Sequence, residues 1–127
     1  MIGKGEMTIP PVIGVVDDEP AQRRLLEETL QRAGWRVLCG EDGRQAVELA
    51  PRCDLMLLDV RMPGMSGLEA LDKIRQLPRP PVVVLLTAYI DVRDAVAAIK
   101  MGAADYLEKP VDLDELLTVI EDCLGLG

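Results

Sequence analysis

The stretch Leu-Met-Leu-Leu-Asp at residues 55–59 places four consecutive apolar side chains directly before a carboxylate. A continuous apolar run of this length is typical of a strand that is covered on both faces, as in a parallel sheet. Two other runs share this character, Val12–Val16 after Pro10-Pro11 and Val82–Leu86 after Pro80-Pro81. We therefore expect buried strands at residues 12–16, 55–58 and 82–86.

The flanking segments predict two edge strands and the helices between the strands. Trp35–Cys39 and Asp105–Glu108 are shorter or more polar, as edge strands are. Apolar residues recur at i, i+3, i+4 and i+7, which predicts one face of a helix, at Val92, Ala95, Val96 and Ile99 and again at Leu113, Leu116, Leu117, Ile120 and Leu124. Helix starts are predicted at Pro20, Asp42, Ser66 with Glu69, Asp91 and Asp112 with Glu115, and helix ends at Gly34 and Gly102.

Five strands that alternate with five helices predict a doubly wound α/β sandwich. Three apolar strands between two polar edges match the flavodoxin-like strand order 2-1-3-4-5 of a parallel sheet, in which the second and fifth strands are the edges. The length of 127 residues suits one domain. We expect that domain at residues 9–127, after an N-terminal tail at residues 1–8.

Composition argues against several classes of protein. The net charge is −8, so we expect no direct binding to nucleic acid, whose phosphates an acidic surface repels. The cysteines Cys39, Cys53 and Cys123 fit neither a disulfide framework nor a zinc site, and we expect free thiols in a reducing cytoplasm. No apolar run approaches the ~20 residues of a membrane helix, so we expect a cytoplasmic protein without membrane contact.

Acidic residues follow two of the predicted buried strands. Asp17, Asp18 and Glu19 come directly after the first, and Asp59 comes directly after residues 55–58. Because these strands are neighbours in the predicted order, three Asp carboxylates converge at one edge of the sheet. Like charges this close need a shared cation, and carboxylate oxygens suit Mg²⁺. The alternative is that Asp17 and Asp18 only cap the next helix.

A hydroxyl and an ammonium group follow the last two predicted strands. Thr87 can donate a hydrogen bond to an incoming anion, and the alternative is an ordinary cap or turn threonine. Lys109 can reach an anion with its flexible side chain, and the alternative is a solvated surface lysine. Pro110 either begins the turn into the last helix or forms a cis bond that aims Lys109 inward. Combined with the acids, these groups suit a phosphoryl group: a metal and Lys109 neutralise its oxygens while a carboxylate attacks phosphorus and forms a mixed anhydride.

Four motifs resemble the receiver domains of bacterial two-component response regulators. They are Val15-Val16-Asp17-Asp18-Glu19, then residues 57–67 (LLDVRMPGMSG), then Leu86-Thr87-Ala88-Tyr89, then residues 105–110 (DYLEKP). The resemblance runs from about residue 9 to residue 124, and the four motifs at these spacings are highly specific together. Residues 87–116 are also similar to the receivers of enhancer-binding transcriptional activators.

The resemblance implies a role for each matching residue of the acidic cluster. Asp59 is the expected phospho-acceptor, and Mg²⁺ is the expected cofactor. Asp18 binds the metal directly, Asp17 binds it directly or through water, and the backbone carbonyl of Arg61 is a further ligand.

The remaining implied roles concern the phosphoryl oxygens and the switch. Thr87 and Lys109 hold the oxygens, and Tyr106 is the switch aromatic that turns inward when Thr87 moves toward the phosphate. The change then reaches the face formed by residues 91–101 and 104–124. The alternative is that Tyr106 is a static, half-buried aromatic of an edge strand.

The resemblance also implies partners and an activity. A sensor histidine kinase or a phosphotransfer protein supplies the phosphoryl group. The altered face controls an output domain or effector, or joins two copies of the chain, and transcription regulation is the expected output. The chain is expected to catalyse only its own phosphotransfer and slow dephosphorylation, and it is otherwise not an enzyme.

Two residues depart from what the resemblance or strand packing favours. Val111 follows Lys109-Pro110, where many relatives carry Phe. Gly14 lies in the middle of a predicted strand, where a larger residue is expected to be more stable.

Three other functions fit the residues less well. A Mg²⁺-dependent phosphatase of the haloacid dehalogenase type also uses an Asp after a buried strand, but it needs a second Asp two residues later, where this chain has Arg61. A degenerate receiver that binds partners without phosphorylation usually lacks the acid pair, the acceptor or the lysine, and none of these is lost here. A nucleotide-binding flavodoxin-like fold would have a glycine-rich loop after the first strand, where this chain has residues 17–20 (DDEP).

Overall fold

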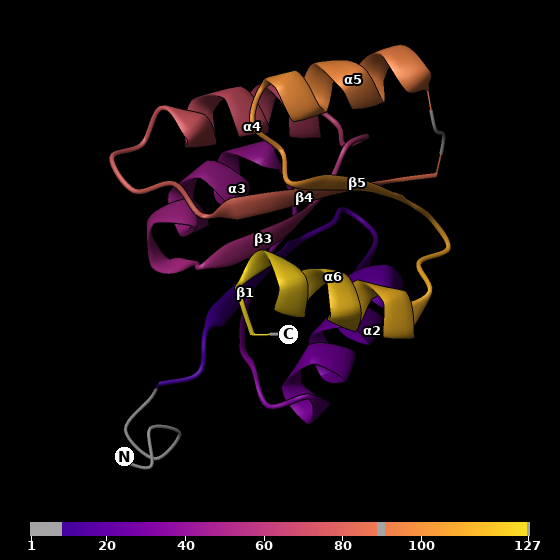
Figure 1. Cartoon of the computed structure of the whole chain (residues 1–127). Coiled ribbons are helices and arrows are strands. Elements are labelled where there is room, and N and C mark those ends of the chain that lie inside the picture. Colours follow the sequence, from indigo (N-terminus) through magenta and orange to yellow (C-terminus); the bar gives the residue numbers. More distant parts are fainter. Residues whose placement is uncertain (1–8, 89–90, 127) are drawn as a thin grey trace.

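Five parallel strands form one sheet in the order β2-β1-β3-β4-β5, which confirms the predicted order (Figure 1). The computed structural model describes residues 9–88 and 91–126, so the predicted tail at residues 1–8 lies outside the described residues. With the labels of Figure 1, the strands are β1 (Val12–Val16), β2 (Arg36–Gly40), β3 (Leu55–Asp59), β4 (Val82–Thr87) and β5 (Asp105–Glu108).

Helices cover both faces of this sheet (Figure 1). They are α2 (Pro20–Arg32), α3 (Gly43–Leu49), α4 (Gly67–Arg75), α5 (Val92–Lys100) and α6 (Leu113–Cys123), with a short 3₁₀ turn η1 at Ala50–Arg52. Leu26 and Leu30 of α2 and Leu116 and Ile120 of α6 pack on one face, and α3, α4 and α5 contribute to the core on the other face. Each fully buried leucine or isoleucine stabilises the fold by about 2 kcal/mol.

The predicted helix starts and ends are confirmed by hydrogen bonds and backbone angles. Ser66 and Glu69 form a reciprocal capping box at the start of α4. The carboxylates of Asp42, Asp91 and Asp112 each accept a hydrogen bond from a backbone N–H in the first turn of their helices. Pro20 is the first residue of α2, and Gly34 and Gly102 have φ angles of 97° and 106° just after α2 and α5. Residues other than glycine rarely adopt such angles.

Four strand boundaries, in three of the strands, differ from the prediction by one residue. β2 begins at Arg36, not Trp35, and ends at Gly40. β3 and β4 each extend one residue further, so that Asp59 and Thr87 are the last residues of their strands. Both residues still pair with a neighbouring strand, Asp59 with Leu86 and Thr87 with Glu108. Their side chains are therefore held by the regular sheet and not by a loop.

The expectation that a larger residue at position 14 would be more stable is wrong. A Cβ atom on Gly14 would lie 2.8 Å from the Cys53 Sγ atom and 3.2 Å from the Met56 Cγ atom. The space beside this glycine is already filled by two side chains of the core. Glycine is needed in mid-strand here because another part of the chain approaches closely.

The apolar face predicted for residues 92–99 faces away from the core. Val92, Val96 and Ile99 are 72%, 47% and 49% exposed, whereas Ala98 is fully buried. An amphipathic helix usually turns its apolar face toward the protein interior. In α5 a small alanine makes the core contact, and the larger apolar side chains lie on the surface. Among the described residues, no helix has the length and apolar character needed to cross a membrane.

Candidate functional site

Three carboxylates meet where β1 and β3 end side by side. One oxygen from each of Asp17, Asp18 and Asp59 lies within 4.8 Å of the others. Asp17 is 1% exposed and Asp59 is 5% exposed, whereas Asp18 is exposed. Hard oxygen donors in a group of this size, with one side open to solvent, fit Mg²⁺, which keeps several of its waters when bound. The structure therefore brings together the three carboxylates that the sequence selected.

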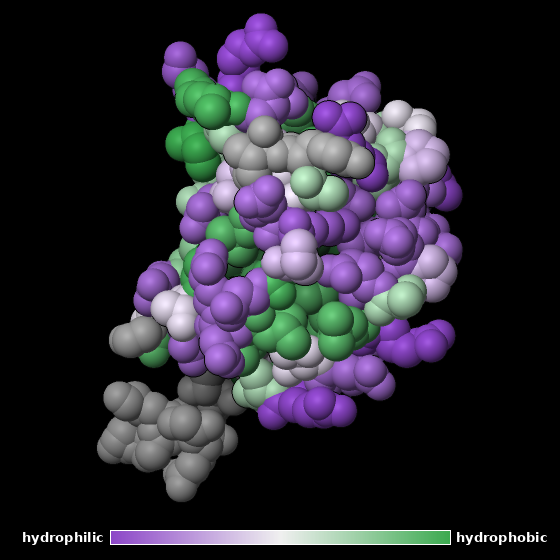
Figure 2. All heavy atoms as spheres, turned by 90° about the vertical axis from the view of Figure 1, so that its right-hand side faces the viewer, coloured by the Kyte–Doolittle hydropathy of each residue, from purple (hydrophilic) through white to green (hydrophobic). Residues whose placement is uncertain are grey.

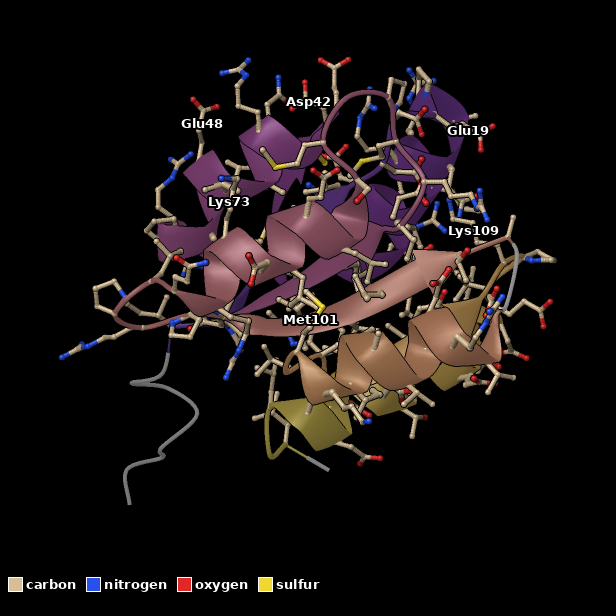
Figure 3. The ribbon with its side chains drawn as sticks, turned by 90° about the horizontal axis from the view of Figure 1, so that it is seen from above. Glu19, Asp42, Glu48, Lys73, Met101 and Lys109 are labelled. Atoms are coloured by element: carbon tan, nitrogen blue, oxygen red, sulfur yellow. The ribbon has the colours of Figure 1, made fainter. Side chains whose placement is uncertain are left out.

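Lys109 lies between two of these carboxylates. Its Nζ atom is 2.9 Å from Asp17 Oδ2 and 3.2 Å from Asp59 Oδ2. The backbone N–H of Lys109 donates to the Thr87 carbonyl at 2.7 Å, which fixes the start of the side chain beside β4. Figure 3 shows Lys109 and Glu19 at the same edge of the sheet, the edge toward which the β4 strand points. The Lys109–Pro110 peptide bond is cis, which was one of the two alternatives for Pro110.

The pKa values of Asp59 and Lys109 are both raised, although burial acts on the two groups in opposite directions. Burial raises the pKa of Asp59, and the nearby Asp17 charge raises it further, although Lys109 opposes both effects. Burial alone lowers the pKa of Lys109, but its hydrogen bonds and ion pairs with Asp17 and Asp59 outweigh burial, so the pKa of Lys109 is raised. The Lys109 ammonium is therefore kept charged, and the Asp59 carboxylate is less stable as an anion than a carboxylate in water.

Asp17 also organises the start of α2. Its Oδ1 atom accepts a hydrogen bond from the Glu19 N–H at 2.9 Å, and its backbone carbonyl accepts one from the Arg23 Nη1 atom at 2.7 Å. The helix-capping alternative is thus partly correct, because one carboxylate oxygen of Asp17 stabilises the turn before α2. The other oxygen points into the site, toward Lys109.

Arg61 contributes its side chain to the surroundings of the site, whereas sequence reasoning assigned a role only to its backbone carbonyl. A hollow of about 250 Å³ above Asp59 is lined by Asp18, Glu19, Asp59, Arg61, Ala88 and Lys109. Arg61 also borders a second hollow of about 440 Å³, which reaches Asp94 of α5. The backbone N–H of Arg61 donates to Asp59 Oδ1 at 3.2 Å. Its residue type, a cation two positions after Asp59, was the available signal.

Thr87 and Tyr106 are in contact before any phosphoryl group is present. Thr87 is 1% exposed at the end of β4, and its hydroxyl is hydrogen-bonded to the Tyr106 side chain. Tyr106 is half-buried, and burial, followed by the charge of Asp94, raises the pKa of its phenol. The two residues proposed as the switch therefore touch directly, and Tyr106 connects Thr87 with α5.

Gly67 is a residue of the site that sequence reasoning missed. A Cβ atom here would overlap the carbonyl oxygen of Asp59 and would lie 2.8 Å from the Val60 Cα atom. The Gly67 N–H donates to the Val60 carbonyl at 2.8 Å. α4 can begin directly against the end of β3 only because residue 67 has no side chain. Its position beside the capping residue Ser66 was the signal that could have identified it.

Comparison with known proteins gives the same picture as the geometry. The family model described as "Response regulator receiver domain" matches residues 13–121. The chain is 40% identical over 122 residues to the regulatory protein AtoC of Escherichia coli K12, covering 94% of this chain and 26% of AtoC. It is 41% identical over 116 residues to the DNA-binding transcriptional regulator NtrC of the same strain, covering 90% of this chain and 25% of NtrC.

A solved structure shares both fold and sequence. It is the receiver domain of sensor histidine kinase PA1611 from Pseudomonas aeruginosa PAO1, in which a magnesium ion is coordinated in the active site cleft. The TM-score is 0.83 at 31% identity, covering 92% of this chain and 99% of the other. The chain thus spans about a quarter of the length of the two regulators and nearly all of an isolated receiver. Its fold, its acidic cluster and its match to the family model agree, and the chain belongs to the response regulator receiver domain family.

Proposed function

We propose that the chain accepts one phosphoryl group on Asp59 and thereby acts as a switch in a two-component system. The observation that carries this proposal is the position of Lys109, whose ammonium bridges Asp17 and Asp59 beside the third carboxylate, Asp18. In one small space, the cluster offers Asp59 as a carboxylate that can accept the group, Lys109 as a fixed cation and an open position that an anion can occupy. Asp17 and Lys109 are both largely buried, so their electrostatic effect on a phosphoryl group is only weakly screened.

Asp17, Asp18 and Asp59, together with the carbonyl of Arg61, are the proposed ligands of Mg²⁺. The supporting observation is the convergence of three carboxylate oxygens within 4.8 Å of one another. When bound, the ion supplies positive charge that offsets the repulsion between the acceptor and the phosphoryl oxygens. Asp18, as the exposed member of the three, is the group best able to adjust its position to the ion.

In the proposed transfer, one carboxylate oxygen of Asp59 attacks the phosphorus of a phosphodonor. The new O–P bond forms as the bond from phosphorus to the donor's nitrogen or oxygen breaks, and the donor keeps that electron pair. Lys109 and the Thr87 hydroxyl hold the oxygens of the transferred group. The product is a mixed anhydride, which water later cleaves to restore the carboxylate. The proposed donor is a sensor histidine kinase or a phosphotransfer protein, and the chain's own catalysis is limited to these two steps.

The phosphoryl group must alter a surface in order to signal. We place the altered surface on α5, β5 and α6, because Thr87 is hydrogen-bonded to Tyr106 of β5, and Tyr106 lies close to Asp94 of α5. Movement of Thr87 toward a phosphoryl oxygen would either break this hydrogen bond or move the Tyr106 side chain with Thr87. The proposed consequence is control of an output domain or effector in the cytoplasm, with transcription the favoured output because NtrC is a transcriptional regulator.

Intact-mass measurement tests the acceptor assignment. The protein is incubated with Mg²⁺ and acetyl phosphate, or with a phosphorylated histidine kinase, as wild type, Asp59→Asn and Asp72→Asn. Asp72 is an exposed carboxylate of α4 outside the site and serves as the matched control. We expect one added phosphoryl group on the wild type and on Asp72→Asn, and none on Asp59→Asn. Full labelling of the Asp59→Asn variant at another residue would exclude Asp59 as the acceptor.

A further inference from the structure

Arg23 of α2 holds the peptide unit that joins the first two acids of the cluster. Its Nη1 atom donates a hydrogen bond to the Asp17 backbone carbonyl at 2.7 Å, and this carbonyl belongs to the peptide bond between Asp17 and Asp18. The Arg23 side chain is 18% exposed, so water competes little for the contact. Hydrogen bonds from a charged donor are shorter and stronger than those between neutral groups. The first turn of α2 is thereby fastened to the end of β1.

The other polar groups of Asp17 have partners as well. Its N–H donates to the Gly40 carbonyl at 3.2 Å, and its Oδ1 atom accepts from the Glu19 N–H at 2.9 Å. Its Oδ2 atom accepts from Lys109 Nζ at 2.9 Å. The N–H, the carbonyl and both carboxylate oxygens of Asp17 are therefore all engaged, and the carbonyl is the group that Arg23 holds.

The orientation of this peptide unit determines how the two carboxylates diverge. The edge of the sheet at which the strands end faces the viewer in Figure 2, and hydrophilic residues cover much of it. Asp17 is 1% exposed and Asp18 is exposed, yet one oxygen of each lies within 4.8 Å of the other. Mg²⁺ demands near-octahedral positions at about 2.0–2.1 Å. Because a peptide unit is rigid and planar, its rotation moves the residues on both sides and would separate oxygens that have to meet at one ion.

The Arg23 guanidinium has two opposite effects on a cation bound at the cluster. As a positive charge, it repels Mg²⁺ and should lower the affinity for the ion. As a hydrogen-bond donor, it holds the peptide unit in place and should raise that affinity. The Arg23 Nη2 atom lies 4.0 Å from an oxygen of Glu41, whose side chain is 67% exposed, and such a contact offsets little of the charge. Removal of the Arg23 side chain therefore distinguishes the two effects by the sign of the change in Mg²⁺ affinity.

We infer that Arg23 is a positioning residue of the metal site. It holds the peptide unit between Asp17 and Asp18 so that both carboxylates can bind one Mg²⁺, and this geometric effect outweighs the repulsion between the guanidinium and the ion. The inference rests on the proposed function, since it concerns the metal ion that the proposed transfer uses. It adds to the site a residue that lies outside the proposed set of ligands.

Isothermal titration calorimetry with Mg²⁺ tests the inference on three variants. Arg23→Met removes the charge and the donor but keeps a flexible apolar side chain. Arg23→Lys keeps the charge but replaces the rigid, planar guanidinium with a flexible ammonium. Arg24→Met is the matched control, because Arg24 is the next residue of α2, is exposed and gives the same change in net charge. In EDTA, exchange of the Glu19 N–H with water is measured by ¹⁵N NMR, and urea unfolding gives the stability of each variant.

Arg23→Met should lower the Mg²⁺ affinity about tenfold, a loss typical of removing a group that orients a metal ligand. Arg24→Met should raise the affinity or leave it within about twofold, because it removes only a solvent-screened charge. Arg23→Lys should lower it about threefold although the net charge is unchanged. Without metal, the Glu19 N–H should exchange at least about tenfold faster in Arg23→Met, because its acceptor on Asp17 is held less firmly, while the amides of β3 keep their protection.

Unchanged or tighter Mg²⁺ binding in Arg23→Met would overturn the inference, as would an equal loss in Arg24→Met or unchanged exchange of the Glu19 N–H. If urea unfolding shows that Arg23→Met does not fold, wild-type affinity in Arg23→Lys overturns the inference instead. Labelling of Asp59 by acetyl phosphate is measured on the same proteins. Labelling of the wild type with unchanged affinity in Arg23→Met rejects only the inference, whereas an affinity loss in Arg23→Met without labelling of the wild type rejects only the proposed function.

Discussion

At the scale of single residues, the site contains more negative charge than its one ammonium can neutralise. Asp17, Asp18 and Asp59 face Lys109, and two of these carboxylates are almost completely buried. Buried like charges raise one another's free energy unless a cation compensates them. The resting site is therefore poised to bind a divalent cation, and each acid is expected to contribute unequally because their exposures differ.

Asp18→Ala should lower the affinity for Mg²⁺ by at least about tenfold, because it removes a carboxylate from a small set of hard oxygen donors. Glu19→Ala is the control: the Glu19 side chain is exposed, and Asp17 contacts its backbone N–H, which the substitution retains. Isothermal titration calorimetry measures both affinities. Equal losses in the two variants would contradict the assignment of Asp18 to the metal.

Asp59→Asn should stabilise the metal-free protein at neutral pH by about 1 kcal/mol, because it removes a buried charge beside Asp17. The folded-state pKa of Asp59 lies above its ordinary value of 3.8. A carboxyl group whose pKa is higher in the folded state than in the unfolded state contributes most to stability at a pH below its unfolded-state pKa. This contribution is lost as the pH rises through its folded-state pKa. The gain from Asn should therefore shrink as the pH is lowered.

Urea unfolding in EDTA, from about pH 5 to pH 8, measures this dependence. Mg²⁺ should reduce or reverse the advantage of the Asn variant, because the ion stabilises the charged form of the wild type. An Asn variant that is less stable than the wild type throughout this range, without metal, would show that the ion pair with Lys109 outweighs burial.

At the scale of elements, α4 and α5 are attached to the sheet in different ways. α4 buries Ala70, Leu71 and Ile74 and starts with a reciprocal capping box. α5 buries Ala98, near its C-terminal end, where the Ala103 N–H donates to the Ala98 carbonyl at 3.0 Å. Figure 3 shows Met101, the residue that follows α5, at that same end of the helix. The N-terminal half of α5 is thus the easier part to displace, and it is the half that adjoins the end of β4.

Ser66→Ala should destabilise the domain by about 1 kcal/mol, because the Glu69 N–H, 3.2 Å from the Ser66 hydroxyl, loses its acceptor. Lys73→Ala, an exposed change in the same helix, should alter the free energy of unfolding by less than about 0.5 kcal/mol. Urea unfolding of the two variants gives both values. Similar values for the two substitutions would mean that the capping box contributes little to α4.

The limits of prediction from sequence are clearest in these elements. Strands and helix starts were predictable because apolar runs, caps and glycines act locally, and the errors at Trp35 and Asp59 were one residue. The exposure of Val96 was not predictable, since an apolar stripe that faces a core and one that faces a partner have the same pattern. The requirements at Gly14 and Gly67 depend on atoms of distant or adjoining backbone, and only the folded chain reveals them.

At the scale of the whole molecule, the parallel sheet brings the site residues from four separate segments, at the ends of β1, β3, β4 and β5, to one edge. Once the strand order 2-1-3-4-5 was predicted, the meeting of Asp18, Asp59 and Lys109 followed, because the carboxyl ends of parallel strands lie together. The contact between Thr87 and Tyr106 needed the structure, since it depends on side-chain conformations. The same sheet order also places β5 at an edge, where a change can reach the surface.

Phosphorylation should change the hydrogen exchange of amides in α5, β5 and α6 as well as those around Asp59. The expected path runs through the Thr87–Tyr106 hydrogen bond, and only a few kcal/mol of differential binding are needed to shift such an equilibrium. Exchange is measured by mass spectrometry with and without Mg²⁺ and beryllofluoride. In Tyr106→Ala the change at α5 should be lost while the change at Asp59 remains. Protection at Asp59 with no change on α5 and β5 in the wild type would mean that the switch does not pass through Tyr106.

The close approach of Gly14 to Cys53 and Met56 has a consequence for how this sequence can vary during evolution. An alanine at position 14 requires room that the Cys53 sulfur and the Met56 side chain now occupy. Substitutions at these positions should therefore be accepted as pairs and not singly. Among descendants of this sequence, we expect that a residue larger than glycine at position 14 occurs together with a smaller residue at position 53 or 56, so that the three positions covary although they share no catalytic role.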